Sequence, residues 1–73
     1  MSRTRGPYTC VVQQQAGFGV EWTETSLRAA MRETRERVQA GYSNDEDGTV
    51  DAADGQRLAC WVNVSGRAER RNV

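Results

Sequence analysis

The amino-acid sequence predicts an α+β fold, ββαββ, in which an antiparallel sheet carries one amphipathic helix on one face. Three observations support this prediction. Residues of opposite polarity alternate over 8–13 and again over 18–23, which is typical of strands with one buried face. Between 27 and 38 the apolar spacing changes to three and four, as in a helix. A second alternating run occupies 57–64.

The chain has 73 residues, the length of one domain. We expect a flexible N-terminal arm over 1–7, a single domain over 8–64 and a polar C-terminal tail over 65–73. A core of this size leaves little room for an enclosed active site.

The first two strands are predicted to form a hairpin around the turn at Ala16-Gly17. Its apolar face should contain Tyr8, Cys10 and Val12 from the first strand and Phe18, Val20 and Trp22 from the second.

The helix is predicted to begin after Thr25 or Ser26, since either hydroxyl can cap a helix start. Gly41 is a natural stop. The stripe facing the sheet should comprise Leu27, Ala30, Met31, Thr34 and Val38.

The second half of the chain is predicted to contain a loop over 43–48, a short strand over 49–53 and a longer strand over 57–64. In the longer strand Leu58, Cys60, Val62 and Val64 should face the helix, with Ala59, Trp61 and Asn63 on the other side. This register exposes Trp61 on the open sheet face beside Val11. A register shifted by one residue would instead place Trp61 in the core.

All ten cationic side chains are arginine, and the chain contains neither lysine nor histidine. Lysine-based covalent catalysis and histidine general-base chemistry are therefore excluded. No Gly-rich phosphate loop, nucleophile elbow or isolated carboxylate pair is visible. We expect no enzyme and no cofactor. Ten acidic residues balance the arginines, so net charge implies neither nucleic acid nor a membrane as partner.

The residues predicted to bind a partner are Trp61, Val11, Arg28, Arg32 and Arg35. An exposed tryptophan is a common anchor of protein interfaces, and a basic helix flank can grip an acidic protein or track phosphates. The alternatives are a solvated helix face, a nucleic-acid-binding regulator that also uses Arg67, Arg70 and Arg71, and a homodimer that hides Trp61.

An acidic stretch matches the twelve-residue EF-hand pattern in part. Its candidate ligands are Asp45, Asp47, Asp51 and Asp54, with Gly48 at the glycine position. Residues 47–54 resemble the calcium loop of dockerin modules, which implies calcium binding. Ser43 stands where a carboxylate is expected, and 57–64 favours a strand over the exiting helix. The alternative interpretation is a solvated acidic turn.

The polar N-terminus lacks the apolar region of a signal peptide, and no window is long and apolar enough for a membrane span. We therefore expect a cytoplasmic protein. Cys10 and Cys60 should then be buried thiols, with a disulfide as the alternative.

These features predict a small binding module that occludes or adapts a host protein or protein complex. The build of hairpin, amphipathic helix and further strands resembles the small accessory proteins of bacteriophages and mobile elements, among them anti-CRISPR proteins. That resemblance implies a stoichiometric inhibitor of host machinery. It carries no residue-level motif.

Overall fold

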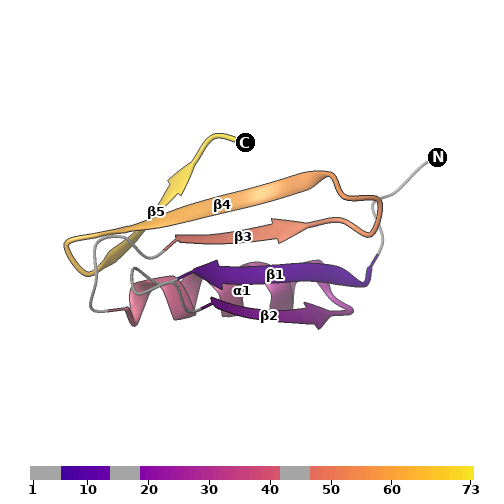
Figure 1. The fold of residues 1–73 in the computed structure, drawn as a ribbon, viewed down its shortest axis with the longest axis horizontal. Coiled ribbons are helices and arrows are strands. Elements are labelled where there is room, and N and C mark those ends of the chain that lie inside the picture. Colours follow the sequence, from indigo (N-terminus) through magenta and orange to yellow (C-terminus); the bar gives the residue numbers. More distant parts are fainter. Residues whose placement is uncertain (1–5, 14–18, 42–46) are drawn as a thin grey trace.

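The computed structural model describes residues 6–13, 19–41 and 47–73 and confirms the α+β fold (Figure 1). One helix packs on an antiparallel sheet whose strands lie in the order β2-β1-β3-β4-β5. In chain order the elements are β1 (Tyr8–Gln13), β2 (Gly19–Glu24), α1 (Leu27–Gln39), β3 (Asp47–Asp51), β4 (Arg57–Val64) and β5 (Arg67–Arg71).

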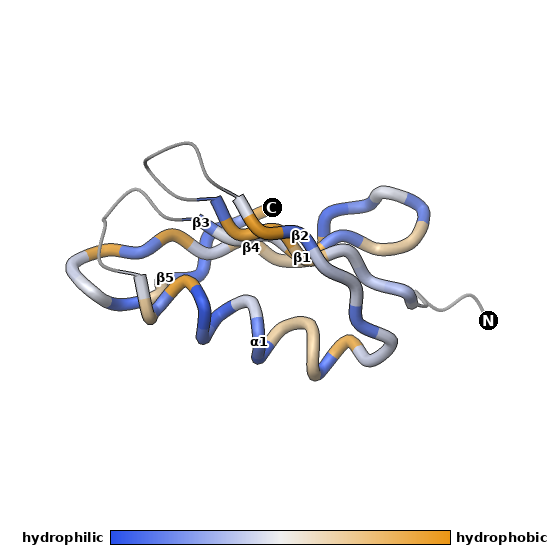
Figure 2. Tube along the Cα trace, turned by 60° about the horizontal axis from the view of Figure 1, so that its bottom comes forward, coloured by the Kyte–Doolittle hydropathy of each residue, from blue (hydrophilic) through white to orange (hydrophobic). Residues whose placement is uncertain are grey.

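Helix α1 lies along one side of the sheet (Figure 2). It begins at Ser26, whose side-chain Oγ accepts a hydrogen bond from the backbone N–H of Ala29 at 3.3 Å. Its apolar stripe is close to the predicted one. Ala30, Thr34 and Val38 are fully buried. Leu27, at the start of the helix, is instead 37% exposed.

The core lies between α1 and the central strands. Tyr8, Cys10 and Val12 of β1 face the helix as predicted, and Val50 of β3 lies beside them in register with Cys10. Gly48 of β3 pairs with Val12, and there the helix packs closely against the backbone of the sheet. A Cβ atom on Gly48 would lie 2.6 Å from Cγ2 of Val38. The missing side chain therefore sets how near the helix can pack.

The predicted register of β4 is wrong by one residue. Ala59, Trp61 and Asn63 face the helix, and only 4% of Trp61 is exposed, whereas Cys60 and Val62 are half-buried on the opposite face. Counting apolar residues favoured the opposite register, because β4 is apolar on both sides. A bulge between β3 and β4 also changes the pairing at Val50/Asp51. The expectation of an exposed Trp61 on the open face is accordingly wrong.

Asn63 is a polar residue on the helix-facing side of β4, and its side chain bonds to the end of the helix. It is fully buried, and its side-chain Nδ2 donates hydrogen bonds to the backbone C=O of Val38 at 2.7 Å and of Gly41 at 3.2 Å. Its Oδ1 accepts from the backbone N–H of Gly66 at 3.0 Å. Carbonyls at a helix C-terminus lack partners within the helix. Asn63 thus links the end of α1 to the turn between β4 and β5.

The prediction of a polar tail over 65–73 is wrong for Arg67–Arg71, which form the edge strand β5. The turn before it has two residues, Ser65 with φ 54° and Gly66 with φ 85°. Positive φ at both positions is typical of the type I′ turn that joins paired strands. The chain therefore does not leave the sheet after Val64 but turns back along β4.

The predicted turn at Ala16-Gly17 and the inward position of Phe18 lie outside the described residues, and the predicted arm over 1–7 and loop over 43–48 lie partly outside them. The rest of the first hairpin has the predicted faces, since Cys10 pairs with Trp22 and Val12 with Val20. Trp22 is half-buried, while Val20, on the edge strand, is 44% exposed.

The two free thiols lie on opposite faces of the sheet, Cys10 toward the helix and Cys60 away from it. Burial raises the pKa of the Cys10 thiol, which keeps it protonated and unreactive. We therefore expect a thiol reagent to label Cys60 in the folded protein and both cysteines in denaturant. The Cys60→Ser variant should show almost no labelling until it unfolds. Equal labelling rates for both thiols in the folded wild-type protein would contradict this arrangement.

Candidate functional site: an arginine-lined groove

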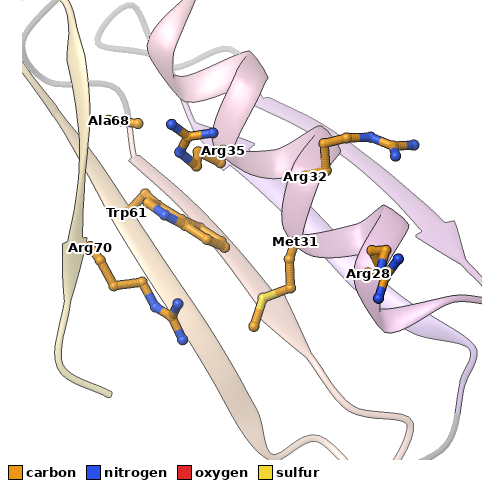
Figure 3. A pocket seen from close by; sticks show the side chains of 7 residues that line it. All are labelled: Arg28, Met31, Arg32, Arg35, Trp61, Ala68 and Arg70. Atoms are coloured by element: carbon orange, nitrogen blue, oxygen red, sulfur yellow. The ribbon is translucent and has the colours of Figure 1, made fainter.

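Four arginine side chains surround a cavity of about 480 Å³ between α1 and the β4–β5 hairpin (Figure 3). We call this site the arginine groove. Its lining consists of Arg28, Met31, Arg32 and Arg35 from α1, Trp61 from β4, and Ala68 and Arg70 from β5. Among the described residues no carboxylate lines it. A site with this composition is suited to an anionic ligand.

One wall of the groove is a row of arginines along α1. Arg28, Arg32 and Arg35 are four and three residues apart, so they lie on one flank of the helix over a length of about 10 Å. Like charges at these spacings destabilise a helix by about 0.2–0.5 kcal/mol per pair. This cost is relieved when an anion lies between the guanidinium groups.

Strand β5 provides the other wall and β4 the floor. The Cζ atom of Arg70 lies 5.2 Å from the centre of the Trp61 ring, a cation–π contact that holds the guanidinium over the indole. Met31 of the helix approaches the same ring from the other side (Figure 3). Ala68 also lines this side of the groove, and its small side chain leaves space above the strand at that position. Trp61 therefore holds Arg70 in place at the floor of the groove.

Few carboxylates in the described part of the chain neutralise the charge of the groove arginines. In the described part of the chain one groove arginine is in an ion pair: Nη2 of Arg32 lies 3.7 Å from Oε2 of Glu33, and both side chains are exposed to solvent. A pair of this kind contributes little in water. Within the same residues, Arg28, Arg35 and Arg70 have no carboxylate within 4.0 Å. Most of the positive charge is thus available to a ligand.

Four of the five predicted partner-binding residues meet here: Arg28, Arg32, Arg35 and Trp61. Trp61 lies on the helix-facing side of the sheet, opposite to the side predicted. Val11 does not belong to the groove, since it lies on the open face of the sheet. There it lines a smaller cavity of about 260 Å³ with Gln13, Asp47, Thr49 and Arg57. The sequence predicts Arg70 only as a nucleic-acid contact, because the charged run over Arg67–Arg71 does not have the alternation of a strand.

The structure does not give residues 47–54 the shape of a calcium loop. Asp47 to Asp51 form the extended strand β3, and Asp51 pairs with Arg57, whose Nε lies 3.0 Å from Oδ1 of Asp51. Asp54 caps the next turn by accepting a hydrogen bond from the backbone N–H of Gln56. A strand directs ligands outward along a line and does not wrap them around an ion. Asp45 lies outside the described residues.

No protein-family model, curated protein or solved structure significantly matches the chain. The only helix among the described residues has 13 residues, and it is too short and too polar to cross a membrane.

Proposed function

We propose that this protein is a non-enzymatic binding module that holds an acidic segment of a partner protein in the arginine groove. The observation that carries the proposal is that four arginine side chains from two elements line one cavity that has no carboxylate in its described lining. Guanidinium groups bind carboxylates through paired, charge-assisted hydrogen bonds. A host protein or protein complex is the expected source of that segment.

Three features favour a protein over nucleic acid. Only 4% of Trp61 is exposed and Arg70 lies over its ring, so a base has no free aromatic surface on which to stack. The groove wall is also short, about 10 Å along α1. The chain as a whole has no net positive charge to concentrate a polyanion around it.

Nucleic acid remains the second candidate because β5 extends the positive charge beyond the groove. Arg67 and Arg71 lie on the open face of that strand, and Arg71 has only a long, exposed pair with Glu69 at 3.9 Å. A phosphate backbone that crossed the edge of β5 would contact arginines on both of its faces. Such binding would depend on the total charge rather than on the groove.

Two double variants with the same change of charge separate the candidates. Arg28→Gln with Arg35→Gln removes two charges from the groove, and Arg67→Gln with Arg71→Gln removes two from the open face. Binding of a fluorescent glutamate-rich peptide, measured by anisotropy, should weaken at least about tenfold in the groove variant. In the open-face variant it should change by no more than about twofold.

Equal weakening in both variants, or failure of the peptide to bind the wild-type protein, would overturn the proposal. A single-stranded oligonucleotide provides the comparison. Tight, strongly salt-dependent binding of the oligonucleotide, reduced equally by both double variants, would support the nucleic-acid candidate instead. The phage or mobile-element setting implied by the resemblance in build stays a prediction about the partner's pathway.

A further inference from the structure

We propose that the acidic segment binds as a sixth strand on the free edge of β5, antiparallel to it, with acidic side chains at alternate positions reaching into the arginine groove. This inference rests on the proposed function and adds the conformation and sequence pattern of the ligand. It depends on three features: the edge position of β5, the register of the β4–β5 hairpin and the charge of the groove.

Strand β5 lies at an edge of the sheet, so within the part of the chain that the structure describes no strand pairs with the other side of its backbone. Within the described residues no backbone hydrogen bond outside the β4–β5 ladder involves 67–71. An edge of this kind pairs readily with an extended segment of another chain.

The register determines which backbone groups are open. In a hairpin with a two-residue turn, the pair next to the turn is hydrogen-bonded, and such pairs alternate along the ladder. Val64 pairs with Arg67 next to the turn, so Arg67, Glu69 and Arg71 direct their N–H and C=O groups toward β4. The N–H and C=O groups of Ala68 and Arg70 therefore point to the free edge.

Ala68 and Arg70 are also the residues of β5 that line the groove. An antiparallel strand added about 4.8 Å beyond β5 would place its hydrogen-bonded residues opposite these two. Their side chains would stand on the helix-facing side of the sheet, directed toward Arg70 and the arginine row of α1. The small side chain of Ala68 leaves room for one of them to cross the wall. Carboxylates at alternate positions fit this pattern.

A second copy of this chain fits less well as the added strand. The other free edge is β2, whose acidic residues are Glu21 and Glu24. Glu21 pairs with Val11 and so lies on the open face, while Glu24 already accepts a hydrogen bond from Nε1 of Trp22 at 3.1 Å. The edge of β2 in a second copy would thus direct only one carboxylate, that of Glu24, toward the groove, and this carboxylate already accepts a hydrogen bond. Basic and neutral strands are disfavoured by the four guanidinium groups.

The test uses peptides that differ only in pattern or in backbone donors. The peptide Thr-Glu-Thr-Glu-Thr-Glu-Thr should bind at least about tenfold more tightly than Thr-Thr-Glu-Glu-Glu-Thr-Thr, which has the same charge but not the alternation. N-methylation of its glutamates removes the donors that face β5 and should weaken binding about tenfold or more. N-methylation of its inner threonines is the matched control, because those N–H groups face away, and should cost about twofold or less.

Binding is measured by calorimetry on the full chain, with sedimentation to exclude self-association. Equal affinity of both patterns, with no effect of either methylation, would overturn the strand addition while leaving the anion-binding groove intact. If none of the peptides binds, the proposed function itself fails. A wild-type protein that is a dimer without peptide and dissociates when β5 is altered would show that a second copy occupies the edge, which also overturns the inference.

Discussion

Replacing Asn63 with aspartate should destabilise the fold by about 3–5 kcal/mol, the usual cost of an unpaired charge in a protein interior. The substitution keeps the size of the side chain but removes the amide that donates to the C=O groups of Val38 and Gly41. A carboxylate in its place would face two carbonyl oxygens in a fully buried position. Because a domain of this length is stable by only a few kcal/mol, we expect the variant to be largely unfolded at 25 °C.

Urea denaturation followed by circular dichroism measures this effect. Asn72→Asp is the matched control, since Asn72 is exposed near the C-terminus and the same chemical change there should alter the free energy of unfolding by about 0.5 kcal/mol at most. An Asn63→Asp variant with the wild-type denaturation midpoint would show that the amide does not hold the helix end to the hairpin.

Substitution of Gly48 by alanine should cost about 1–3 kcal/mol, the range found when a methyl group is forced into a packed interior. Its Cβ would lie 2.6 Å from Cγ2 of Val38 and 2.8 Å from Cγ2 of Thr34, so the helix must move away from β3. Thr34 and Val38 are both fully buried in the interface between the helix and the sheet, so neither side chain can move aside into solvent.

A second substitution tests the cause. Val38→Ala should restore part of the stability lost in Gly48→Ala, although it is destabilising by itself, because the two residues share one space. Gly19→Ala is the control, since its Cβ would find its nearest neighbour at 3.5 Å, an ordinary contact. Additive losses in the double variant would contradict steric conflict between Gly48 and Val38.

Much of the fold follows from hydrophobic periodicity. The faces of β1 and β2 and the bounds of α1 were predictable because each segment has one apolar side and one polar side. The hydroxyl of Ser26 and the change of spacing at Leu27 marked the start of the helix. These features are local, and a single sequence contains them.

The errors occurred where tertiary contacts override the pattern. In β4 both faces are largely apolar, and Asn63 lies inside because it meets two carbonyls, one in the last turn of α1 and one just beyond it, more than twenty residues away. No local pattern of β4 indicates those carbonyls. Gly48 was aligned with the glycine of a calcium loop, whereas the structure uses its lack of a side chain to admit the helix.

The candidate site was predictable in part. Arg28, Arg32 and Arg35 share a helix flank by spacing alone, and that flank is one wall of the groove. The opposite wall required recognition of β5, whose charged sequence has no apolar alternation. Strand β5 forms because the turn at Ser65-Gly66 directs the chain back along β4, and the only indication of this in the sequence is the dipeptide itself.

The two-residue turn at Ser65-Gly66 makes the site far more vulnerable to insertions and deletions than to substitutions. Successive residues of a strand point to opposite faces, so one residue added to the turn would exchange the two faces of β5. Ala68 and Arg70 would leave the groove, and Glu69 would enter it between arginines from neighbouring positions. The groove that we propose to bind acidic side chains would then contain a carboxylate of its own, although the composition of the strand would be unchanged. In this protein the length of one turn therefore determines the chemical preference of a surface formed by other residues.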